Sequence, residues 1–228
     1  MNIPFADGLL RQYVAQRARA RPVPPISEWR LRETRSVLLV LTTGLGDAVL
    51  STPVFPALRK ALPDAEIRLL CRAAWVPLFA ADPDLNGVIR YPGKYRRFLS
   101  LVAELRRFSP DITIVLHGND PDILPLAFLS GSRFIVRIPT EGTRYGFLLS
   151  NRDRGEDRAI VPGWHYIENR LRILDTIGVV PVERYPRVHL APAVGEDMAA
   201  RMRARLEGRT YRSEEHTPEL QSLAYLVC

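Results

Sequence analysis

Short apolar segments recur along the chain, and stretches with helical spacing separate them. Ser36–Leu41 (SVLLVL) and Asp111–Leu116 (DITIVL) are almost continuously apolar. Such runs are typical of strands buried on both faces of a parallel sheet. We predict five strands in all: Ser36–Leu41, Glu66–Cys71, Val88–Tyr91, Asp111–Leu116 and Phe134–Arg137.

The stretches between these strands repeat their apolar residues at helical intervals. After Asp47, the side chains of Val49, Leu50 and Val54 share one helical face, and Pro63 ends the pattern. Further helices are predicted near Val76–Ala81, Tyr95–Phe108, Ile123–Leu129, Trp164–Ile177 and Val194–Glu207. Strands that alternate with helices predict an α/β fold with a doubly wound parallel sheet, which is Rossmann-like.

The first 35 residues form a basic leader that contains several prolines. Leu9, Leu10, Tyr13 and Val14 fall at helical spacing, and the Arg-Pro-Val-Pro-Pro run at 21–25 must break that helix. Two interpretations are open. The helix is either an amphipathic segment that makes a peripheral contact with an anionic membrane, or it packs on the following domain.

Three further regions follow the leader. We expect residues 36–187 to form the Rossmann-like domain, and residues 188–211 to be a linker and the start of a second domain whose remainder is missing. Residues 212–228 match none of the preceding patterns. Within them, Arg212–Ser222 resembles, apart from Pro218, the translation of a sequencing-adapter oligonucleotide, and a genuine disordered tail is the alternative. We therefore expect this tail to be non-native and leave it out of the fold.

Composition narrows the class of protein. The chain has a net charge of +7 and 46% apolar residues, without an apolar run long enough to span a bilayer or a secretory signal at its start. Cys71 and Cys228 are too isolated for a disulfide framework or a metal site, so we expect a cytoplasmic protein, in solution or at the inner face of the membrane. Basic charge favours anionic partners, but the arginines are scattered and no nucleic-acid motif occurs, so nucleic acid is not expected.

The turn after the first strand carries the most informative chemistry. Thr42–Asp47 (TTGLGD) lies where ligands bind in a doubly wound sheet. Its glycines permit a close approach, and helix-start amides favour an anionic group. Asp47 is either a helix-start residue satisfied by those amides, or a general base that takes a proton from a sugar hydroxyl. The turn lacks the third glycine of the dinucleotide fingerprint and the lysine of a phosphate loop.

A longer string around this turn resembles glycosyltransferase family 9, which includes the lipopolysaccharide heptosyltransferases. It runs from Thr43 to Pro53 (TGLGDAVLSTP) and is followed by Ala57-Leu58-Arg59 and Pro63. Four other segments agree in order and spacing, and the resemblance spans about residues 36–193. These segments are Asp82-Pro83-Asp84 with Val88-Ile89, Asp111–Gly118, Arg133–Arg137, and His165-Tyr166 with Asn169 and Gly178.

The resemblance implies the amino-terminal half of a two-domain GT-B enzyme. Such an enzyme transfers a sugar from a nucleotide-diphosphate donor to a saccharide or glycolipid acceptor, with inversion and without a metal or cofactor. The donor would be held by the missing second domain, so this chain alone should be inactive. By the same resemblance Asp47 matches the catalytic base, and Thr43, Gly44 and Gly46 frame the reaction site.

Other polar residues near strand ends are candidates for acceptor binding. His117 and Asn119 would line the cleft, by resemblance. Arg72, Arg137 and Arg144 could bind phosphates or carboxylates, because a guanidinium binds these groups in a bidentate manner. Each of them has a structural alternative, as a satisfied turn residue or a solvated charge. His165 is expected to pack or cap its helix. A non-catalytic Rossmann-like module that binds an anionic ligand is the second hypothesis for the whole chain.

Overall fold

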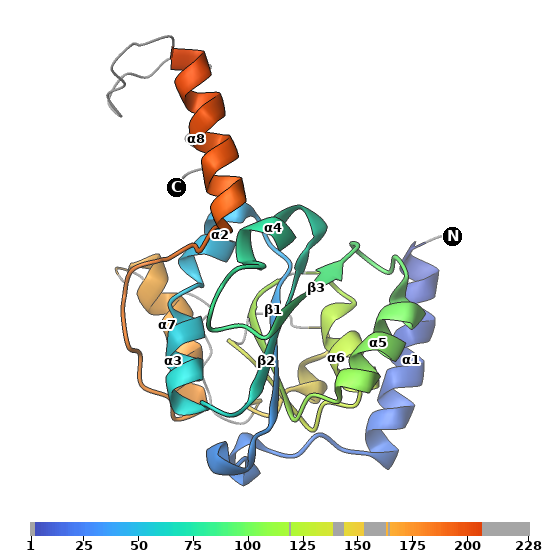
Figure 1. Ribbon diagram of the computed structural model, residues 1–228. Helices are drawn as coiled ribbons and strands as arrows, with labels where there is room; N and C mark the ends of the chain where they lie inside the picture. Colours follow the sequence, from blue (N-terminus) through green and yellow to red (C-terminus); the bar gives the residue numbers. More distant parts are fainter. Residues whose placement is uncertain (1–2, 119, 139–143, 153–162, 164, 207–228) are drawn as a thin grey trace.

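The sheet has five parallel strands in the order β3-β2-β1-β4-β5. The structure is a computed structural model that describes residues 3–118, 120–138, 144–152, 163 and 165–206 (Figure 1). The strands are β1 Ser36–Leu41, β2 Glu66–Arg72, β3 Gly87–Tyr91, β4 Ile112–His117 and β5 Phe134–Arg137. All five predicted strands are confirmed, as is the doubly wound α/β fold.

Helices cover both faces of this sheet (Figure 1). The helices α2, α3 and α7 lie on one face, and α1, α5 and α6 lie on the other. The α-helices are α1 Ile3–Ala20, α2 Leu45–Leu50, α3 Val54–Ala61, α4 Val76–Phe79, α5 Phe98–Phe108, α6 Ile123–Leu129, α7 Tyr166–Thr176 and α8 Pro192–Leu206. The 3₁₀ turns are η1 Ile26–Glu28, η2 Leu31–Glu33, η3 Ala73–Trp75 and η4 Gly146–Leu148.

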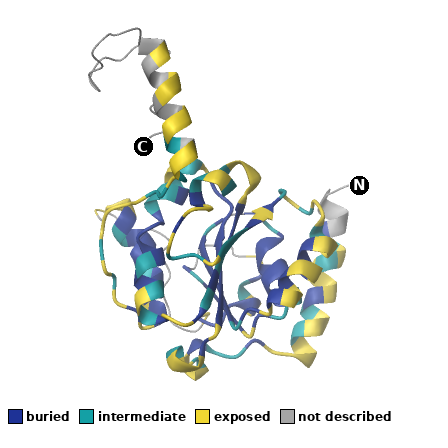
Figure 2. Ribbon diagram, in the orientation of Figure 1, coloured by how far each residue is buried: buried dark blue, intermediate teal, exposed yellow. Residues whose placement is uncertain are grey.

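Two apolar cores lie on opposite faces of the sheet, because side chains alternate along each strand. Leu39 of β1 and Phe55 of α3 belong to the core beneath α3 and α7. Leu38 of β1 and Leu105 of α5 belong to the core beneath α5 and α6. Every residue of β1 is buried, which explains why this segment is apolar at consecutive positions (Figure 2).

Two predicted helices differ most from their expected bounds, whereas the bounds of the others differ by at most two residues at an end. The helix predicted after Asp47 is interrupted at residues 51–53, which separate α2 from α3. Proline disfavours the helical conformation in the residue before it and lacks an amide hydrogen, so Pro53 starts a new helix instead of continuing the first. The helix expected from Tyr95 begins at Phe98, because Tyr95 and Arg97 have positive φ angles of 57° and 51°.

The leader is part of the domain. Val14 of α1 is fully buried in the core beneath α5 and α6. Asp7 is only 2% exposed; it accepts hydrogen bonds from the hydroxyls of Tyr95 and Tyr145 and forms an ion pair with Arg144. These contacts agree with the second interpretation of the leader, in which its helix packs on the following domain. No described helix has the length and apolar character needed to cross a membrane.

The last described helix, α8, extends away from the two layers that flank the sheet (Figure 1). It includes most of the segment that we expected to begin a second domain. The tail 212–228 lies outside the described residues.

We expect Asp7→Ala to lower the free energy of unfolding by about 2 kcal/mol, because it leaves two tyrosine hydroxyls and a guanidinium without their acceptor. Chemical denaturation of both proteins measures this difference. Glu104→Ala removes an exposed acid from α5 and should change stability by less than about 0.5 kcal/mol. Equal effects of the two substitutions would show that Asp7 does not anchor α1.

Candidate functional site

The candidate site lies at the carboxyl ends of β1 and β4, the two neighbouring strands from which the chain leaves in opposite directions. The chain passes from β1 towards β2 and from β4 towards β5. Ligands of doubly wound proteins bind at this switch point, because the two diverging connections leave a crevice. The Thr42–Asp47 turn follows β1, and His117 ends β4.

A β-bulge places His117 beside the first turn. Val40 pairs with Val115, but Leu41 pairs with His117, so Leu116 is an extra residue in β4. A bulge redirects the side chain next to it. The backbone carbonyl of His117 also accepts a hydrogen bond of 3.0 Å from the amide of Thr42, which ties the ends of the two strands together.

Gly118 permits close contact between the same two strand ends. A Cβ atom at this position would lie 2.3 Å from Oγ1 of Thr42. By contrast, a Cβ atom on Gly44 or Gly46 would meet nothing within 4 Å, and neither glycine has a positive φ. These two glycines are exposed and leave open space in front of α2.

Asp47 lies in the first turn of α2, with its side chain 36% exposed. Its Oδ1 accepts a 2.7 Å hydrogen bond from Nη2 of Arg170, and its Oδ2 accepts a 3.1 Å bond from the hydroxyl of Thr43. Nδ1 of His117 lies 4.0 Å from Oδ2. The carboxylate is therefore held at the surface of the sheet edge and is not buried in the core.

Several groups around Asp47 influence its protonation. Burial by itself raises the pKa of the carboxyl, but His117, Arg170 and the hydrogen bond from Thr43 outweigh burial, so the pKa of Asp47 lies below its ordinary value. The pKa of His117 is lowered chiefly by burial and then by the positive charges of Arg170 and Arg137, against the opposing charge of Asp47. At pH 7 the imidazole is therefore mostly neutral, and Arg170 is the permanent cation that faces an ionised Asp47.

Arg170 is one of the site residues that sequence reasoning missed, together with Lys94 and Asp120. Arg170 lies on α7, its side chain is only 10% exposed, and it joins this helix to the turn after β1. The available signal was an arginine between Ile167 and Leu174, on the apolar stripe of a predicted helix. His165 begins the same helix, where its Nδ1 accepts a hydrogen bond from the amide of Ile167, so its expected capping role is confirmed.

A hollow of about 210 Å³ lies beside Asp47. Its rim includes Arg72, whose Nε donates a 2.9 Å hydrogen bond to the carbonyl of Thr42. Trp75 donates in the same way to the carbonyl of Thr43, at 3.0 Å, and so fixes the turn. The lining residues are Thr42, Thr43, Gly44, Arg72, Lys94, His117 and Asp120.

Buried polar atoms without a hydrogen-bond partner among the described residues gather at this hollow. Four of the seven such atoms among the described residues lie here: Thr42 Oγ1, His117 Nδ1, Asp120 Oδ2 and, beside Asp47, Arg170 Nε. Such atoms are uncommon in folded proteins, since each one costs free energy unless it is satisfied. This cluster therefore fits a ligand that carries several hydroxyl groups.

The structure brings most of the predicted site residues together. Thr43, Gly44, Arg72 and His117 line the hollow, and Gly46 and Asp47 lie in the adjoining helix. Arg137 ends β5, next to β4, and its charge acts on His117. Arg144 is instead engaged by Asp7, and Asn119 lies outside the described residues. No cluster of three or more potential metal ligands occurs among the described residues.

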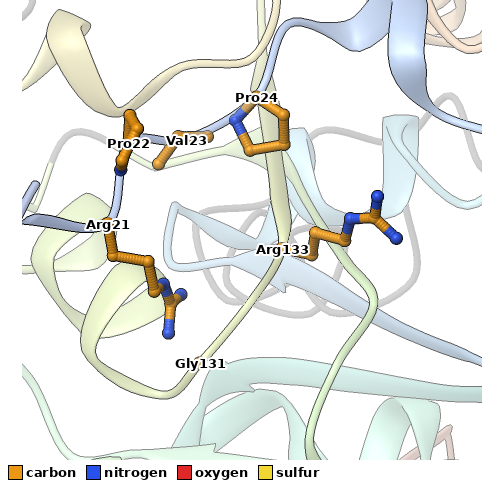
Figure 3. A pocket seen from close by; sticks show the side chains of 6 residues that line it. All are labelled: Arg21, Pro22, Val23, Pro24, Gly131 and Arg133. Atoms are coloured by element: carbon orange, nitrogen blue, oxygen red, sulfur yellow. The ribbon is translucent and has the colours of Figure 1, made fainter.

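A second hollow, of about 360 Å³, lies at the opposite edge of the sheet, between the end of α1 and the turn before β5 (Figure 3). Arg21 and Arg133 line it, but their guanidinium groups do not converge (Figure 3). Arg21 donates to the carbonyl of Ser132 and lies over the ring of Phe128. This hollow lacks the orphaned polar atoms of the first.

Comparison with known proteins identifies heptosyltransferase-like relatives. No family model matches the chain. The chain is 26% identical over 147 residues to lipopolysaccharide heptosyltransferase 3 of Escherichia coli (strain K12), a match that covers 59% of this chain and 40% of that protein. This match agrees with the heptosyltransferase resemblance seen in the sequence.

Two solved structures share the fold. A family 9 glycosyltransferase from Veillonella parvula DSM 2008 superimposes with a TM-score of 0.57 at 19% identity, over 81% of this chain and 55% of that chain. The ADP-heptose lps heptosyltransferase II of E. coli gives 0.56 at 19% identity, over 73% of this chain and 50% of that chain. The chain thus spans about half the length of these structures, and less of the curated relative.

We predict opposite pKa changes of His117 on removal of its two charged neighbours. Arg170→Met should raise the pKa of His117, because a nearby positive charge disfavours imidazolium. Asp47→Asn should lower the pKa further, because a favourable negative charge is lost. NMR titration of the imidazole measures both. Arg184→Gln, which removes an exposed cation from another part of the chain, should leave the titration unchanged; shifts of the wrong sign would contradict the arrangement.

Gly118→Ala should destabilise the protein by about 2 kcal/mol, because its Cβ would collide with the Thr42 hydroxyl. Thr42→Ala removes the atom with which it collides, so the double variant should recover much of the loss. Denaturation of the two single variants and the double variant forms the thermodynamic cycle. Strictly additive losses would show that the two strand ends are not in contact at these positions.

Proposed function

We propose that this chain is the acceptor-binding half of a glycosyltransferase that transfers a sugar from a nucleotide-diphosphate donor to a lipopolysaccharide-type saccharide. The observation that carries the proposal is the ionised, partly exposed Asp47 at the switch point, beside a hollow with orphaned polar groups. The relatives named above support the sugar class, since one is described as a lipopolysaccharide heptosyltransferase and another as an ADP-heptose lps heptosyltransferase.

Asp47 acts as the general base in this mechanism. Arg170 holds Oδ1, whereas Oδ2, which has a single hydrogen bond from Thr43, faces His117 at the hollow. A carboxylate oxygen accepts more than one hydrogen bond, so Oδ2 can also accept one from an acceptor hydroxyl. The lowered pKa keeps Asp47 ionised at neutral pH, in the form that a base requires.

The reaction is a single displacement. The acceptor oxygen forms a bond to the anomeric carbon of the donor as its proton passes to Asp47. The bond between that carbon and the phosphate oxygen breaks, and the leaving nucleoside diphosphate takes the electron pair. Attack from the face opposite the leaving group inverts the anomeric centre. Neither an oxidant nor a metal ion is needed to balance these changes.

The hollow binds the acceptor. Sugar hydroxyls both donate and accept hydrogen bonds, so they can satisfy His117 Nδ1, Thr42 Oγ1 and Asp120 Oδ2. Arg72 and Lys94 lie on the rim and would pair with acceptor phosphates or carboxylates. The open space before Gly44 and Gly46 lets the saccharide approach the turn without a steric conflict.

The donor is held by a second domain in this proposal. The chain covers 40% of the curated relative and about half of each matched structure. The hollow alone offers one side of a reaction site. We therefore expect the 228-residue chain to bind the acceptor saccharide but to transfer no sugar, and the parent enzyme with its donor domain to be active.

In the parent enzyme, Asp47→Asn should reduce kcat by roughly 10² to 10⁴, since proton removal by a positioned base contributes about this much. Acceptor binding to the 228-residue chain, measured by calorimetry, should weaken far less than kcat falls, because the amide keeps the shape of the side chain and still forms hydrogen bonds with Arg170 and the acceptor. Asp64→Asn alters an exposed carboxylate elsewhere and serves as the matched control.

The same measurements decide between the two hypotheses for the chain. Unchanged turnover in Asp47→Asn would remove the base assignment. A parent protein that binds the saccharide but never consumes a nucleotide sugar would instead be the non-catalytic module, in which Arg72 and Lys94 only hold an anionic ligand.

A further inference from the structure

The cations are scattered along the sequence, but the net charge is concentrated in two segments that the proposed reaction hardly uses. Residues 3–21 and 92–108 contain nine of the 32 lysines and arginines but only two of the 25 acidic residues, so together they carry +7, the net charge of the whole chain. The remaining residues contain 23 basic and 23 acidic side chains, so their net charge is zero. Without residues 212–228, which contain one arginine and three glutamates, this net charge is +2.

These segments form one side of the folded domain. The first contains α1 and the second contains α5, and both helices pack on α6 (Figure 1). The Tyr95 hydroxyl, just before α5, is bonded to Asp7 of α1. Near the end of the second segment, Arg106 donates to the carbonyl of Leu129, the last residue of α6. At the end of the first segment, Arg21 donates to the carbonyl of Ser132, just after α6.

The cations of the two segments are exposed, and few acidic residues of these segments offset their positive charge. Asp7 is buried and neutralised by Arg144, so Glu104 is the one exposed acid in the two segments. We call the exposed cations, with the apolar side chains among them, the basic face. Its cations are Arg11, Arg17, Arg19, Arg21, Lys94, Arg96, Arg97, Arg106 and Arg107.

Apolar side chains protrude among these cations. Leu99, in the first turn of α5, is 80% exposed, and Leu9 and Tyr13, one turn apart on α1, are 53% and 45% exposed. Side chains of this kind gain by burial in the boundary between lipid headgroups and acyl chains, and surrounding cations bind anionic headgroups. Nucleic acid would satisfy the cations but leave the leucines in water.

We propose that the basic face docks the domain on an anionic phospholipid membrane. Lys94 belongs both to this face and to the rim of the Asp47 hollow, so the docked domain holds the hollow next to the lipid headgroups. A saccharide carried on a lipid would then reach Asp47 from the membrane surface. This last point rests on the proposed function, whereas the docking itself does not.

The test compares two triple variants of the 228-residue chain that have the same net charge. Arg19→Gln, Arg97→Gln and Arg107→Gln remove three cations of the basic face, and Arg32→Gln, Arg35→Gln and Arg90→Gln remove three exposed cations outside it. Co-sedimentation is measured with vesicles of phosphatidylcholine alone and with vesicles that also contain phosphatidylglycerol. Thermal unfolding confirms that each variant is folded.

We expect binding to the phosphatidylglycerol vesicles only, and a roughly hundredfold loss of affinity in the basic-face variant, because each of its three lost cations contributes about 1 kcal/mol near an anionic surface, which is about a fivefold factor. The control triple should stay within about twofold of the original chain. Leu9→Ser with Leu99→Ser should weaken vesicle binding several-fold and leave any binding to duplex DNA unchanged.

Equal losses in the two triples would show that binding follows net charge and not this face, and would overturn the proposal. Equal binding to both kinds of vesicle would overturn it as well. The proposal would also be overturned if the chain bound duplex DNA more tightly than vesicles and the basic-face triple variant lost this DNA binding. Asp47→Asn should bind vesicles normally, so a failure of the glycosyltransferase proposal would be distinct from a failure of this one.

Discussion

The ion pair between Arg170 and Asp47 is the interaction on which the candidate site depends. It joins α7 to the turn after β1, across 123 residues of sequence. A nearly buried guanidinium needs a carboxylate partner, because an unpaired charge in such a position is strongly destabilising. Asp47 therefore has two roles, since the contact that secures α7 also orients the carboxylate and keeps it ionised. In the proposed reaction the same contact would make Asp47 a weaker base, and the proximity of the acceptor hydroxyl would have to compensate for this.

Strand order determines where that pair lies. Because β1 and β4 are neighbours and the chain leaves them in opposite directions, their carboxyl ends open into a crevice. The bulge at Leu116 and the close approach of Gly118 to Thr42 bring His117 to its edge. The orphaned polar atoms around the hollow are the cost in stability of keeping this edge open to a ligand, and functional sites commonly carry such a cost.

The two proposals concern adjoining surfaces of one domain. The hollow lies at the strand ends, and the basic face covers the layer formed by α1, α5 and α6. The loop between β3 and α5, where Tyr95 and Arg97 have left-handed backbone conformations, belongs to both. Two hydrogen bonds hold this loop at Tyr95. Its hydroxyl donates to Asp7, and its backbone amide donates to Asp122. The leader helix thereby positions Lys94 at the rim of the hollow, although it makes no contact with Asp47.

Local patterns in the sequence determined the strands, most of the helices and the position of Asp47. Continuous apolar runs, helical spacing and the Thr42–Asp47 turn are properties of residues that are close in sequence, so the sequence alone reveals them. The interruption between α2 and α3 was also within reach, since Pro53 marks it. The family 9 resemblance added the proposed role of Asp47 and several residues that line the hollow, such as Arg72 and His117.

Only the tertiary structure decided which distant residues meet. Arg170 was recognisable as an arginine on an apolar stripe, but its partner is 123 positions away, and no local pattern encodes that pairing. Arg144 was predicted to bind a ligand, and only the packing of α1 showed that it also pairs with Asp7. The leader itself allowed two interpretations, because an amphipathic helix has the same spacing on a membrane as on a protein core. Charge pairing and burial depend on proximity in space, and only the folded sheet brings residues that are distant in sequence close together.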